Sequence, residues 1–467
     1  MRKLSLLLFL SIVGIVVFGQ KEDSAFIKRI SDEILVNGKA YENLRHLTKK
    51  IGARLAGSQG MVKSEHWGLK VMQESGADKA YMQECMVPHW VRGGEDRASL
   101  KKKPSGAIDW IRKDLDIVAL GNSIGSEKNG ISGEVIEVKS FDDLEKRKDE
   151  VKGKIVFYNY KFNDTYINTF LAYRDASQYR GQGPSRAAKY GAKAVIVRSM
   201  SHATDNNPHT GATRYDSNYA KIPAVAIGLR DADWLSTEIN AQAETTKPAQ
   251  LELELFTHGH FLPDTIGHNI IGELKGTQFP AEIITVGGHL DSWDNCEGAH
   301  DDGAGCVQTI EILRAFKALG YQPKRTIRFV LFANEENGLR GGNKYADEAK
   351  AKGEKHIFAL ESDAGGFTPR SFGMTGTEEQ FQKFLSWKPL IAPYGCTEFN
   401  RGGGGADIGP LNRAFKTPTA GLNPDSQRYF DIHHARNDVF EAVNKRELDL
   451  GAVNMAALIY LVDKYGM

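Results

Sequence analysis

From residue 266 onward, strand and helix patterns alternate along the chain, and this alternation restricts the fold more than any other feature. The segments EIITVGG, TIRFVLFAN and KHIFALES are short apolar runs typical of buried strands. CVQTIEILRAFKALG, between the first two, has the pattern of an amphipathic helix that ends at Gly320. A last helix is predicted over 445–464, with Asn444 as its cap. Such alternation predicts an α/β fold of three layers, with helices on both faces of a mainly parallel central sheet.

The preceding part of the chain has a different pattern. Residues 25–80 carry apolar positions spaced by three and four, which predicts helices. Residues 116–262 contain short β-rich runs, such as SGEVIEV, AKAVIVRS and QLELELF, divided by turns and two helical patches. This block contains none of the crowded Asp and His stretches found later. We therefore predict that 116–262 is an inserted β-rich domain, which divides the main domain into 20–115 and 263–467.

The beginning of the sequence has the pattern of a secretory signal peptide. Two basic residues precede an apolar run from Leu4 to Phe18, which is short for a membrane-spanning helix. Gly19 suits cleavage before Gln20, so the signal peptide is predicted over 1–19. We expect a secreted or periplasmic protein with no membrane segment after signal removal. A net charge of +1 gives no reason to expect a nucleic-acid partner.

Cysteine usage argues against one class of metal site in this chain. The four cysteines form no CxxC pair, so a structural zinc site built from thiolates is not expected. Export permits disulfides, and Cys296 and Cys306, which flank an Asp- and His-rich stretch, are the pair that a structure should test.

Metal-capable side chains stand at the ends of three predicted strands. The first strand ends at His289, the second at Glu336 and the third at Asp363. Sites in open α/β sheets form at the carboxyl ends of strands, so these groups are expected to lie together. Two further candidates lie in GAHDDGAG and DIHHARND. The predicted metal ligands are His289, Asp301, Glu336, Asp363 and His434.

Two imidazoles and three carboxylates suit zinc, or a similar divalent metal, in a catalytic site. Five ligands exceed what one tetrahedral zinc with an open position needs. They suit two metals about 3.5–4 Å apart that share a carboxylate and a water. Asp301 is the predicted bridging carboxylate. The same donors tolerate cobalt or manganese, so the residues leave the identity of the metal open.

Two acids beside the ligands have predicted catalytic roles. Asp291 lies two residues after His289, on the same face of an extended chain, and is expected to accept the second imidazole N–H and fix its tautomer. Glu335 adjoins Glu336 and can reach the bridging water. It is the predicted general base, which takes a proton from that water and passes it to a leaving amine. The predicted chemistry is metal-assisted hydrolysis.

The motifs that carry these residues resemble, in this order, those of the co-catalytic zinc exopeptidases, the family that includes bacterial leucyl aminopeptidase and glutamate carboxypeptidase. The motifs are GGHLDSW, GAHDDGAG, FANEENGLRGG, ESDAGG and HHARND. The resemblance implies two zinc ions per chain on the five ligands above, with Glu335 as general base and Asp291 as the orienting acid. It also implies a protease-associated domain at 116–262, a homodimer and peptide substrates.

Three further segments, LTKKIGARLAGSQG, VPHWVRGGE and RGGGGADIGPL, extend the resemblance over nearly the whole mature chain. They resemble a branch of the family whose members cleave unsubstituted dipeptides and short peptides. We therefore expect an exported dipeptidase or carboxypeptidase. The alternatives are an aminopeptidase of the same family, a one-zinc acyltransferase similar to glutaminyl cyclase, and a non-catalytic receptor on the same fold. Retention of all five ligands argues against the receptor, and two bound metals would argue against the cyclase.

Two ligand assignments depend on the family pattern. Asp301 is preferred to Asp302 because the family's bridging Asp lies four residues before the last Gly of its motif. His434 is preferred to His433 because the family's ligand His precedes an acid by four residues, here Asp438. His433 then occupies a position that is Tyr in the glutamate carboxypeptidase relatives, from which it could hydrogen-bond the tetrahedral intermediate.

The glycine run RGGGGAD, residues 401–407, is the last candidate. Because glycine lets a substrate approach the backbone closely, Gly403 and Gly404 are predicted, with His433, to contact the substrate. No Lys-Ser/Thr pair follows the glycines, so a phosphate-binding loop is not expected. Recognition of a substrate α-carboxylate would require Arg side chains or N–H groups of such a loop.

Overall fold

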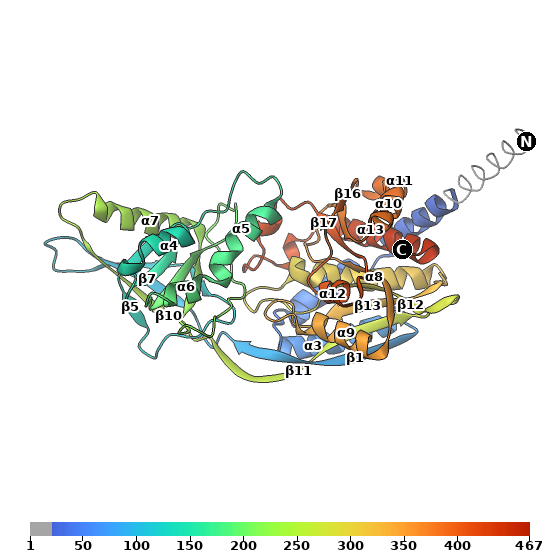
Figure 1. Cartoon of the computed structure of the whole chain (residues 1–467), viewed down its shortest axis with the longest axis horizontal. Helices are drawn as coiled ribbons and strands as arrows, with labels where there is room; N and C mark the ends of the chain where they lie inside the picture. The colour runs from blue at the N-terminus through green and yellow to red at the C-terminus, as the bar shows by residue number, and fades with distance from the viewer. Residues whose placement is uncertain (1–20) are drawn as a thin grey trace, which may run out of the picture.

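The computed structural model describes residues 21–467, so the predicted signal peptide over 1–19 lies outside the described residues. The molecule is elongated and consists of a larger and a smaller body side by side (Figure 1). The larger body holds the C-terminus and the helical residues 21–37. Within the described part of the chain, no helix combines the length and apolar character that crossing a membrane requires.

The larger body is built on a mixed sheet with the strand order β1-β11-β13-β12-β14-β17-β15-β16. The central strands β13, β12, β14 and β17 are parallel. Antiparallel pairs join β1 to β11, β11 to β13 and β15 to β17, and the edge strand β16 is parallel to β15. The predicted parallel arrangement therefore holds at the centre of the sheet. The strands are β1 (Lys79–Val91), β11 (His260–Leu274), β12 (Phe279–His289), β13 (Arg325–Phe332), β14 (Lys355–Glu361), β15 (Pro369–Thr375), β16 (Glu398–Arg401) and β17 (Thr419–Pro424).

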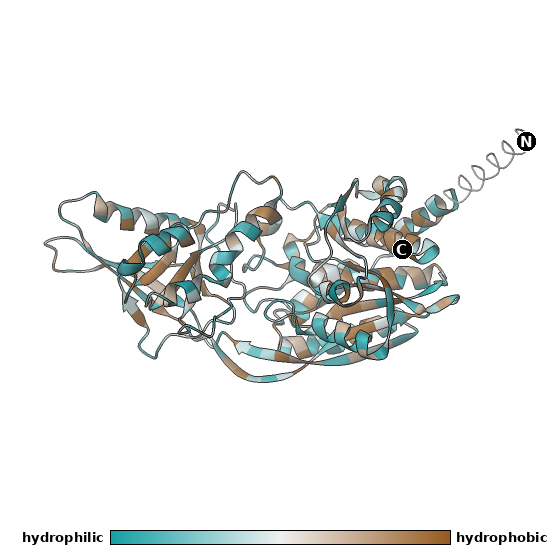
Figure 2. Ribbon diagram, viewed as in Figure 1, coloured by the Kyte–Doolittle hydropathy of each residue, from teal (hydrophilic) through white to brown (hydrophobic). Residues whose placement is uncertain are grey.

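Helices cover both faces of this sheet, which gives the three predicted layers. Along β13, Phe329 and Leu331 pack into the core on the side of α8 and α13, while Val330 and Phe332 pack against α9 and α12. Figure 2 shows the apolar strands enclosed between the helices. The helices are α2 (Ala40–His46), α3 (Gln59–Glu74), α8 (Ala304–Ala318), α9 (Arg340–Lys352), α10 (Glu378–Ser386), α11 (Lys388–Ile391), α12 (Gly409–Phe415) and α13 (Lys445–Tyr465), with short helical turns at Leu47–Ile51, Ala299–Gly303, Ala392–Tyr394, Tyr429–Asp431 and Phe440–Ala442.

The smaller body has two sheets, which share an apolar core between them, and a second core covers the other face of the five-stranded sheet. A five-stranded sheet has the order β4-β9-β8-β7-β6, and a four-stranded sheet has the order β3-β2-β10-β5. The strands are β2 (Arg97–Lys103), β3 (Ile111–Leu115), β4 (Ile117–Ala119), β5 (Ile131–Gly133), β6 (Val135–Val138), β7 (Ile155–Tyr158), β8 (Ala194–Arg198), β9 (Ala224–Ile227) and β10 (Gln250–Phe256), and the helices are α4 (Phe141–Lys146), α5 (Thr169–Gly181), α6 (Gly183–Ala188) and α7 (Leu229–Ala243), with a 3-10 turn at Lys148–Glu150.

The chain leaves and re-enters the larger body through the long antiparallel ribbon of β1 and β11. Val91 at the end of β1 pairs with His260 at the start of β11, so the two ends of the intervening segment lie together. Strands β2 and β3 precede the predicted boundary at residue 116, yet both belong to the sheet of β10. The division into domains stays a prediction, and this pairing favours a first boundary before Arg97.

Candidate metal centre

The carboxyl ends of three parallel strands lie at one edge of the central sheet. The register pairs His289 of β12 with Phe332 of β13, and Gly287 of β12 with Glu361 of β14. The residues that follow β13 and β14 are therefore delivered next to His289. Parallel pairing thus brings the three predicted groups together, as expected for an open α/β sheet.

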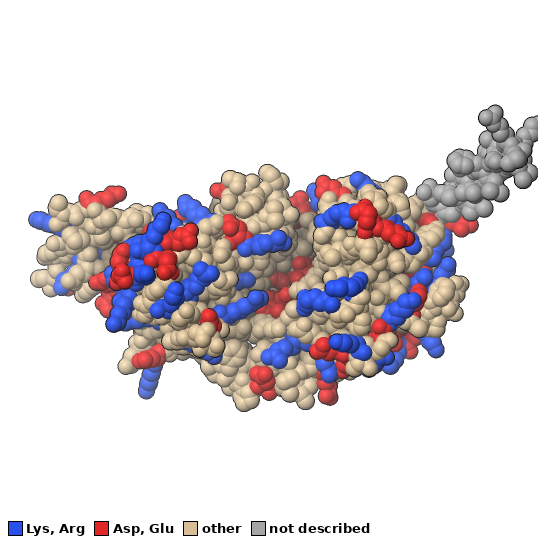
Figure 3. Space-filling model, viewed as in Figure 1, with Lys and Arg blue, Asp and Glu red and all other residues tan. Residues whose placement is uncertain are grey.

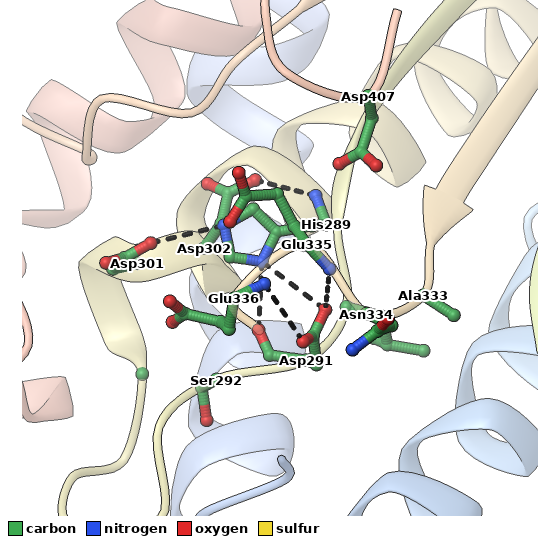
Figure 4. Close-up of polar contacts among 12 residues, drawn as sticks. His289, Asp291, Ser292, Asp301, Asp302, Ala333, Asn334, Glu335, Glu336 and Asp407 are labelled. Carbon is green, nitrogen blue, oxygen red and sulfur yellow. Dashed lines mark hydrogen bonds and ion pairs between the residues drawn. The ribbon is translucent and has the colours of Figure 1, made fainter. Parts of the chain in front are cut away.

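Asp301 lies between the two predicted imidazole ligands. Its Oδ1 is 3.2 Å from Nε2 of His289, and its Oδ2 is 3.1 Å from Nε2 of His434. Nε2 of His289 has a second carboxylate neighbour, Oδ1 of Asp363 at 3.3 Å. Nε2 of His434 likewise has Oε2 of Glu336 at 3.1 Å. Figure 4 shows Asp301 and Glu336 beside His289. Two His–carboxylate sets therefore share one carboxylate.

Two carboxylate oxygens in these sets accept no hydrogen bond from the described part of the chain. Oδ2 of Asp301 and Oε1 of Glu336 are buried and accept no hydrogen bond within residues 21–467. A buried carboxylate oxygen without a donor is unfavourable unless a cation balances it. Two groups of three side chains each bring their donor atoms within 4.8 Å of one another. One group is Asp301, His433 and His434, and the other is His289, Asp302 and Asp363. Imidazole and carboxylate donors in this arrangement fit divalent metal ions.

The geometry separates Asp301 from its neighbour Asp302. Both oxygens of Asp302 accept backbone N–H groups, from His289 and Gly305, each at 3.0 Å. Its carboxylate therefore ties the end of β12 to the start of α8. The Asp301 carboxylate faces the imidazoles, while its own N–H is held by Oδ2 of Asp438 at 3.1 Å. This arrangement supports Asp301 as the shared ligand.

The geometry also separates His434 from His433. Nε2 of His434 lies 3.1 Å from the carboxylates of both Asp301 and Glu336. Nε2 of His433 has one carboxylate neighbour in the described part of the chain, Oδ2 of Asp301 at 3.5 Å. The two rings stack with centroids 3.6 Å apart. Burial lowers the pKa of His433 well below its ordinary value, and the neighbouring His434 lowers it further. A neutral imidazole at this position can hydrogen-bond a reacting group.

Asp291 acts differently from the sequence-based prediction. Nδ1 of His289 contacts the backbone carbonyl of Asp291 at 3.0 Å, while the Asp291 carboxylate is 3.7 Å away. That carboxylate instead accepts the backbone N–H groups of Glu335, at 3.0 Å, and Glu336, at 3.3 Å (Figure 4). A main-chain acceptor orients the imidazole, and the acid fixes the turn that carries the two glutamates.

A residue of the smaller body orients His434. Nδ1 of His434 is 3.3 Å from the carbonyl oxygen of Thr210, and the N–H of Thr210 donates to the carbonyl of His434 at 3.0 Å. His434 has a left-handed backbone, with φ of 61°. This reciprocal contact therefore fixes both the ring and the backbone of the predicted ligand.

Arg54 is a positioning residue that the sequence analysis missed. It is fully buried, and its guanidinium donates to the carbonyl oxygens of Leu290, at 2.5 Å, Glu297, at 2.7 Å, and Gly298, at 2.8 Å. These carbonyls lie at both ends of the loop between His289 and Asp301. The guanidinium therefore sets the path of that loop. The sequence shows only a basic residue in IGARLAGSQG, with no periodic signal for this role.

Glu335 lies half-buried beside the donor sets. Burial raises its pKa well above the ordinary value, and the carboxylates of Asp363 and Glu336 raise it further. Burial likewise raises the pKa of Glu336 to about 7. Burial would lower the pKa of His289, but the nearby carboxylates of Asp363 and Asp301 raise it. Bound cations would stabilise so dense a cluster of buried carboxylates.

Glu335 and the donor sets open into a hollow of about 330 Å³, here called the central pocket. Figure 3 shows acidic side chains in the hollow between the two bodies. On the opposite side, helix α5 and the loop between β8 and β9 supply a wall that the sequence did not predict, because α5 carries no recognisable motif. The wall residues of the smaller body are Phe170, Tyr173, Ser177, Arg180, Ala212 and Arg214.

The predicted substrate-binding glycines lie elsewhere. A Cβ at Gly403 would lie 2.6 Å from the backbone of Gly373, and one at Gly404 would lie 2.9 Å from the Thr419 hydroxyl. The glycines are therefore explained by close packing against β15 and β17. They do not line the central pocket, and their contact with substrate stays a prediction that no geometry supports. His433, by contrast, does line it.

The cysteines form no disulfide. All four are buried and free, including Cys296 and Cys306. The Cys306 thiol donates to the carbonyl of His289 at 2.9 Å, so it packs behind a predicted ligand. The Cys296–Cys306 pair considered from the sequence is therefore absent.

Comparisons with known proteins show what this chain is similar to. The family described as "Peptidase family M28" matches residues 269–459. Human carboxypeptidase Q is 34% identical over 449 residues, which cover 95% of this chain and 90% of that protein. A crystal structure of a peptidase M28 precursor from Shewanella amazonensis is 29% identical, with a TM-score of 0.87, and the match covers 95% of this chain and 97% of that one. A zinc aminopeptidase from Bacillus subtilis has a similar fold, with a TM-score of 0.62 at 22% identity, over 90% and 94% of the two chains.

Proposed function

Because the chain belongs to peptidase family M28, as its motifs predicted, and is a metallo-exopeptidase, we propose that it is an exported di-zinc enzyme that hydrolyses dipeptides or short peptides. The observation that carries this proposal is the placement of Asp301, whose two oxygens face the imidazoles of His289 and His434. The identity to carboxypeptidase Q supports a dipeptidase or carboxypeptidase over an aminopeptidase.

The ligand assignment follows from the donor sets. His289 and Asp363 would hold one ion, His434 and Glu336 the other, and Asp301 both. Zinc suits these donors. Bound ions would polarise the peptide carbonyl and lower the pKa of the attacking water to about 7.

The proposed proton carrier is Glu335. It lines the central pocket, and the Asp291 carboxylate holds its backbone N–H. Glu335 accepts the proton of the attacking water on a carboxylate oxygen and then delivers it to the leaving amine. His433 lines the same pocket as a buried neutral imidazole, so its Nε2 can hydrogen-bond the oxyanion that develops on the carbonyl oxygen.

Substitution of Glu335 tests the mechanism. Glu335→Gln removes the proton acceptor and keeps the shape, so we expect kcat for free dipeptides to fall by about 10²–10⁴-fold. Elemental analysis should find about two zinc ions per chain in both the wild type and the variant. Glu379→Gln, at an exposed position on α10, is the matched control and should behave as wild type. Full activity of Glu335→Gln, or one metal ion per chain or none, would reject the proposal and favour the one-metal or non-catalytic alternatives.

The remaining parts of the proposal concern the whole molecule. We propose that residues 1–19 direct export, that the smaller body is a protease-associated domain and that the enzyme is a homodimer. N-terminal sequencing of the exported protein should begin at Gln20, and light scattering should give the mass of two chains. An intact N-terminus or a monomer would contradict the corresponding part. Separate expression of residues 92–259 as a folded unit would support the domain, and failure to fold would count against it.

A further inference from the structure

The hairpin of β2 and β3 lies at the end of the smaller body that faces away from the larger one (Figure 1). Strand β2 begins at Arg97, soon after β1 ends at Val91, and Lys103 at its far end pairs with Gln250 at the start of β10. Residues 104–111, which join β2 to β3 and include the first residue of β3, are here called the hairpin tip. None of them lines the central pocket.

Three large apolar side chains of the hairpin tip are exposed. Ile108 is 88% exposed, Ile111 is 61% exposed and Trp110 is 41% exposed. The other five tryptophans of the chain are buried or half-buried, so Trp110 is exceptional in its exposure. Apolar side chains that gather on a surface mark a place where another surface binds. The tip is therefore a candidate contact site.

The shape of the tip limits what can cover these side chains. The N–H of Ala107 donates to the carbonyl of Pro104 at 3.0 Å, and Gly106 between them has φ of +82°, so a tight turn fixes the loop. A Cβ at Gly106 would meet nothing within 4 Å, so the turn projects into open space. Three side chains on a projecting turn supply less than the roughly 800 Å² that each partner buries in a stable protein interface. A fluid lipid surface can surround such a tip without a matching shape.

Basic side chains flank the tip on both strands. The hairpin, residues 97–115, has six Lys and Arg residues against two Asp residues. Among the ion pairs of the described residues, Lys101 and Lys102 have partners on β10 and α7, and Lys103, next to the tip, has none. Arg112, on the other side of the tip, is exposed. These cations complement the phosphates of anionic lipid headgroups, which attract each nearby Lys or Arg.

Asp109 sets the depth at which the tip can lie. It is exposed between Ile108 and Trp110. A carboxylate inside the hydrocarbon of a bilayer is unfavourable, whereas Trp is favoured at the level of the headgroups. The composition of the tip therefore suits a shallow contact at the interface. Such a contact needs no spanning segment, and the described chain contains no helix suited to one.

We propose that the hairpin tip docks the protein on an anionic lipid surface. Ile108 and Trp110 lie among the headgroups, and Lys103 and Arg112 lie against the phosphates. Docking through the end of the smaller body leaves the central pocket, between the two bodies, open to soluble peptides. The contact is independent of the proposed hydrolysis, because it uses none of the residues of the candidate metal centre.

Sedimentation with lipid vesicles tests the proposal. We expect the wild type to bind vesicles that contain phosphatidylglycerol, more weakly as salt is added, and to bind pure phosphatidylcholine vesicles poorly. The double variant Ile108→Ser, Trp110→Ser should bind at least about 100-fold more weakly, because each large apolar side chain contributes about tenfold. Lys103→Gln should weaken binding by about fivefold. Ile167→Ser is the matched control, because Ile167 is 86% exposed on another loop, and it should bind as wild type.

Quenching of tryptophan fluorescence by brominated lipids locates the contact. Because the other tryptophans are buried or half-buried, quenching in the bound wild type should come mainly from Trp110. Trp110→Phe keeps an apolar ring at the tip, so it should still bind the anionic vesicles but lose most of the quenching. The Tm of each variant should match that of the wild type, because the substituted side chains are exposed or at the edge of the fold.

Several results would overturn the proposal. They are failure of the wild type to bind anionic vesicles, equal binding to neutral vesicles, and wild-type binding by the double variant. Undiminished quenching in Trp110→Phe would place the lipid contact elsewhere on the molecule. A wild type that ignores vesicles, together with a lower mass of the double variant in light scattering, would assign the hairpin tip to a contact between protein chains instead.

Discussion

Asp301 and Asp302 have the same side chain and adjacent positions, yet the structure gives them different tasks. Asp302 accepts two backbone N–H groups and ties β12 to α8, while Asp301 faces two imidazoles. Sequence spacing alone left this choice open, and only the family pattern favoured Asp301. The same limit applies to Asp291, because alternation along a strand predicts a shared face but not which oxygen of a residue accepts the hydrogen bond.

The two aspartates therefore predict a contrast between isosteric variants. Asp301→Asn should reduce zinc content and lower activity by at least about 10³-fold, because both ions lose a shared charged ligand. Asp302→Asn should retain zinc and lose about 1–3 kcal/mol of stability, because one backbone N–H then faces an amide N–H. Elemental analysis and thermal unfolding check both. Zinc loss in Asp302→Asn, together with zinc retention in Asp301→Asn, would reverse the assignment.

At the scale of elements, the sequence predicted what local periodicity controls. The buried strands β12, β13 and β14 and the helix α8 lie where apolar patterns predicted them. Asn444 caps α13 as expected, with its Oδ1 accepting the N–H groups of Arg446 and Glu447. Because parallel strands end at a common edge, most of the candidate metal centre could be predicted as well.

Contacts between distant elements were beyond that reasoning. Strand β2 pairs with β10, more than a hundred residues later in the chain, and nothing in its own pattern indicates that partner. Strand β3 joins the same sheet by pairing with β2. Helix α5 has an ordinary sequence, and it lines the central pocket only because it packs opposite Glu335. This wall of the pocket is thus a product of tertiary packing.

At the scale of the whole molecule, the candidate site lies where the two bodies meet, so metal binding and docking of the smaller body should be coupled. The backbone of Thr210 contacts both the carbonyl and the ring of His434. Phe367, Tyr429 and Phe430 of the larger body pack into a core of the smaller one. If separation of the bodies releases the metal, saturation at 1,000 times Kd stabilises the docked state by about 4 kcal/mol.

Hydrogen exchange should therefore report the metal state at this junction. With zinc bound, the amide of Thr210, which donates to His434, should exchange about 10³-fold more slowly than after chelation. The amides of β8, buried inside the smaller body, provide the internal control, because their hydrogen bonds are to β7 and β9 and do not involve the larger body. Equal acceleration of β8 and Thr210 would mean that chelation unfolds the whole smaller body. No change at Thr210 would mean that the bodies stay docked without metal, and the coupling would then be absent.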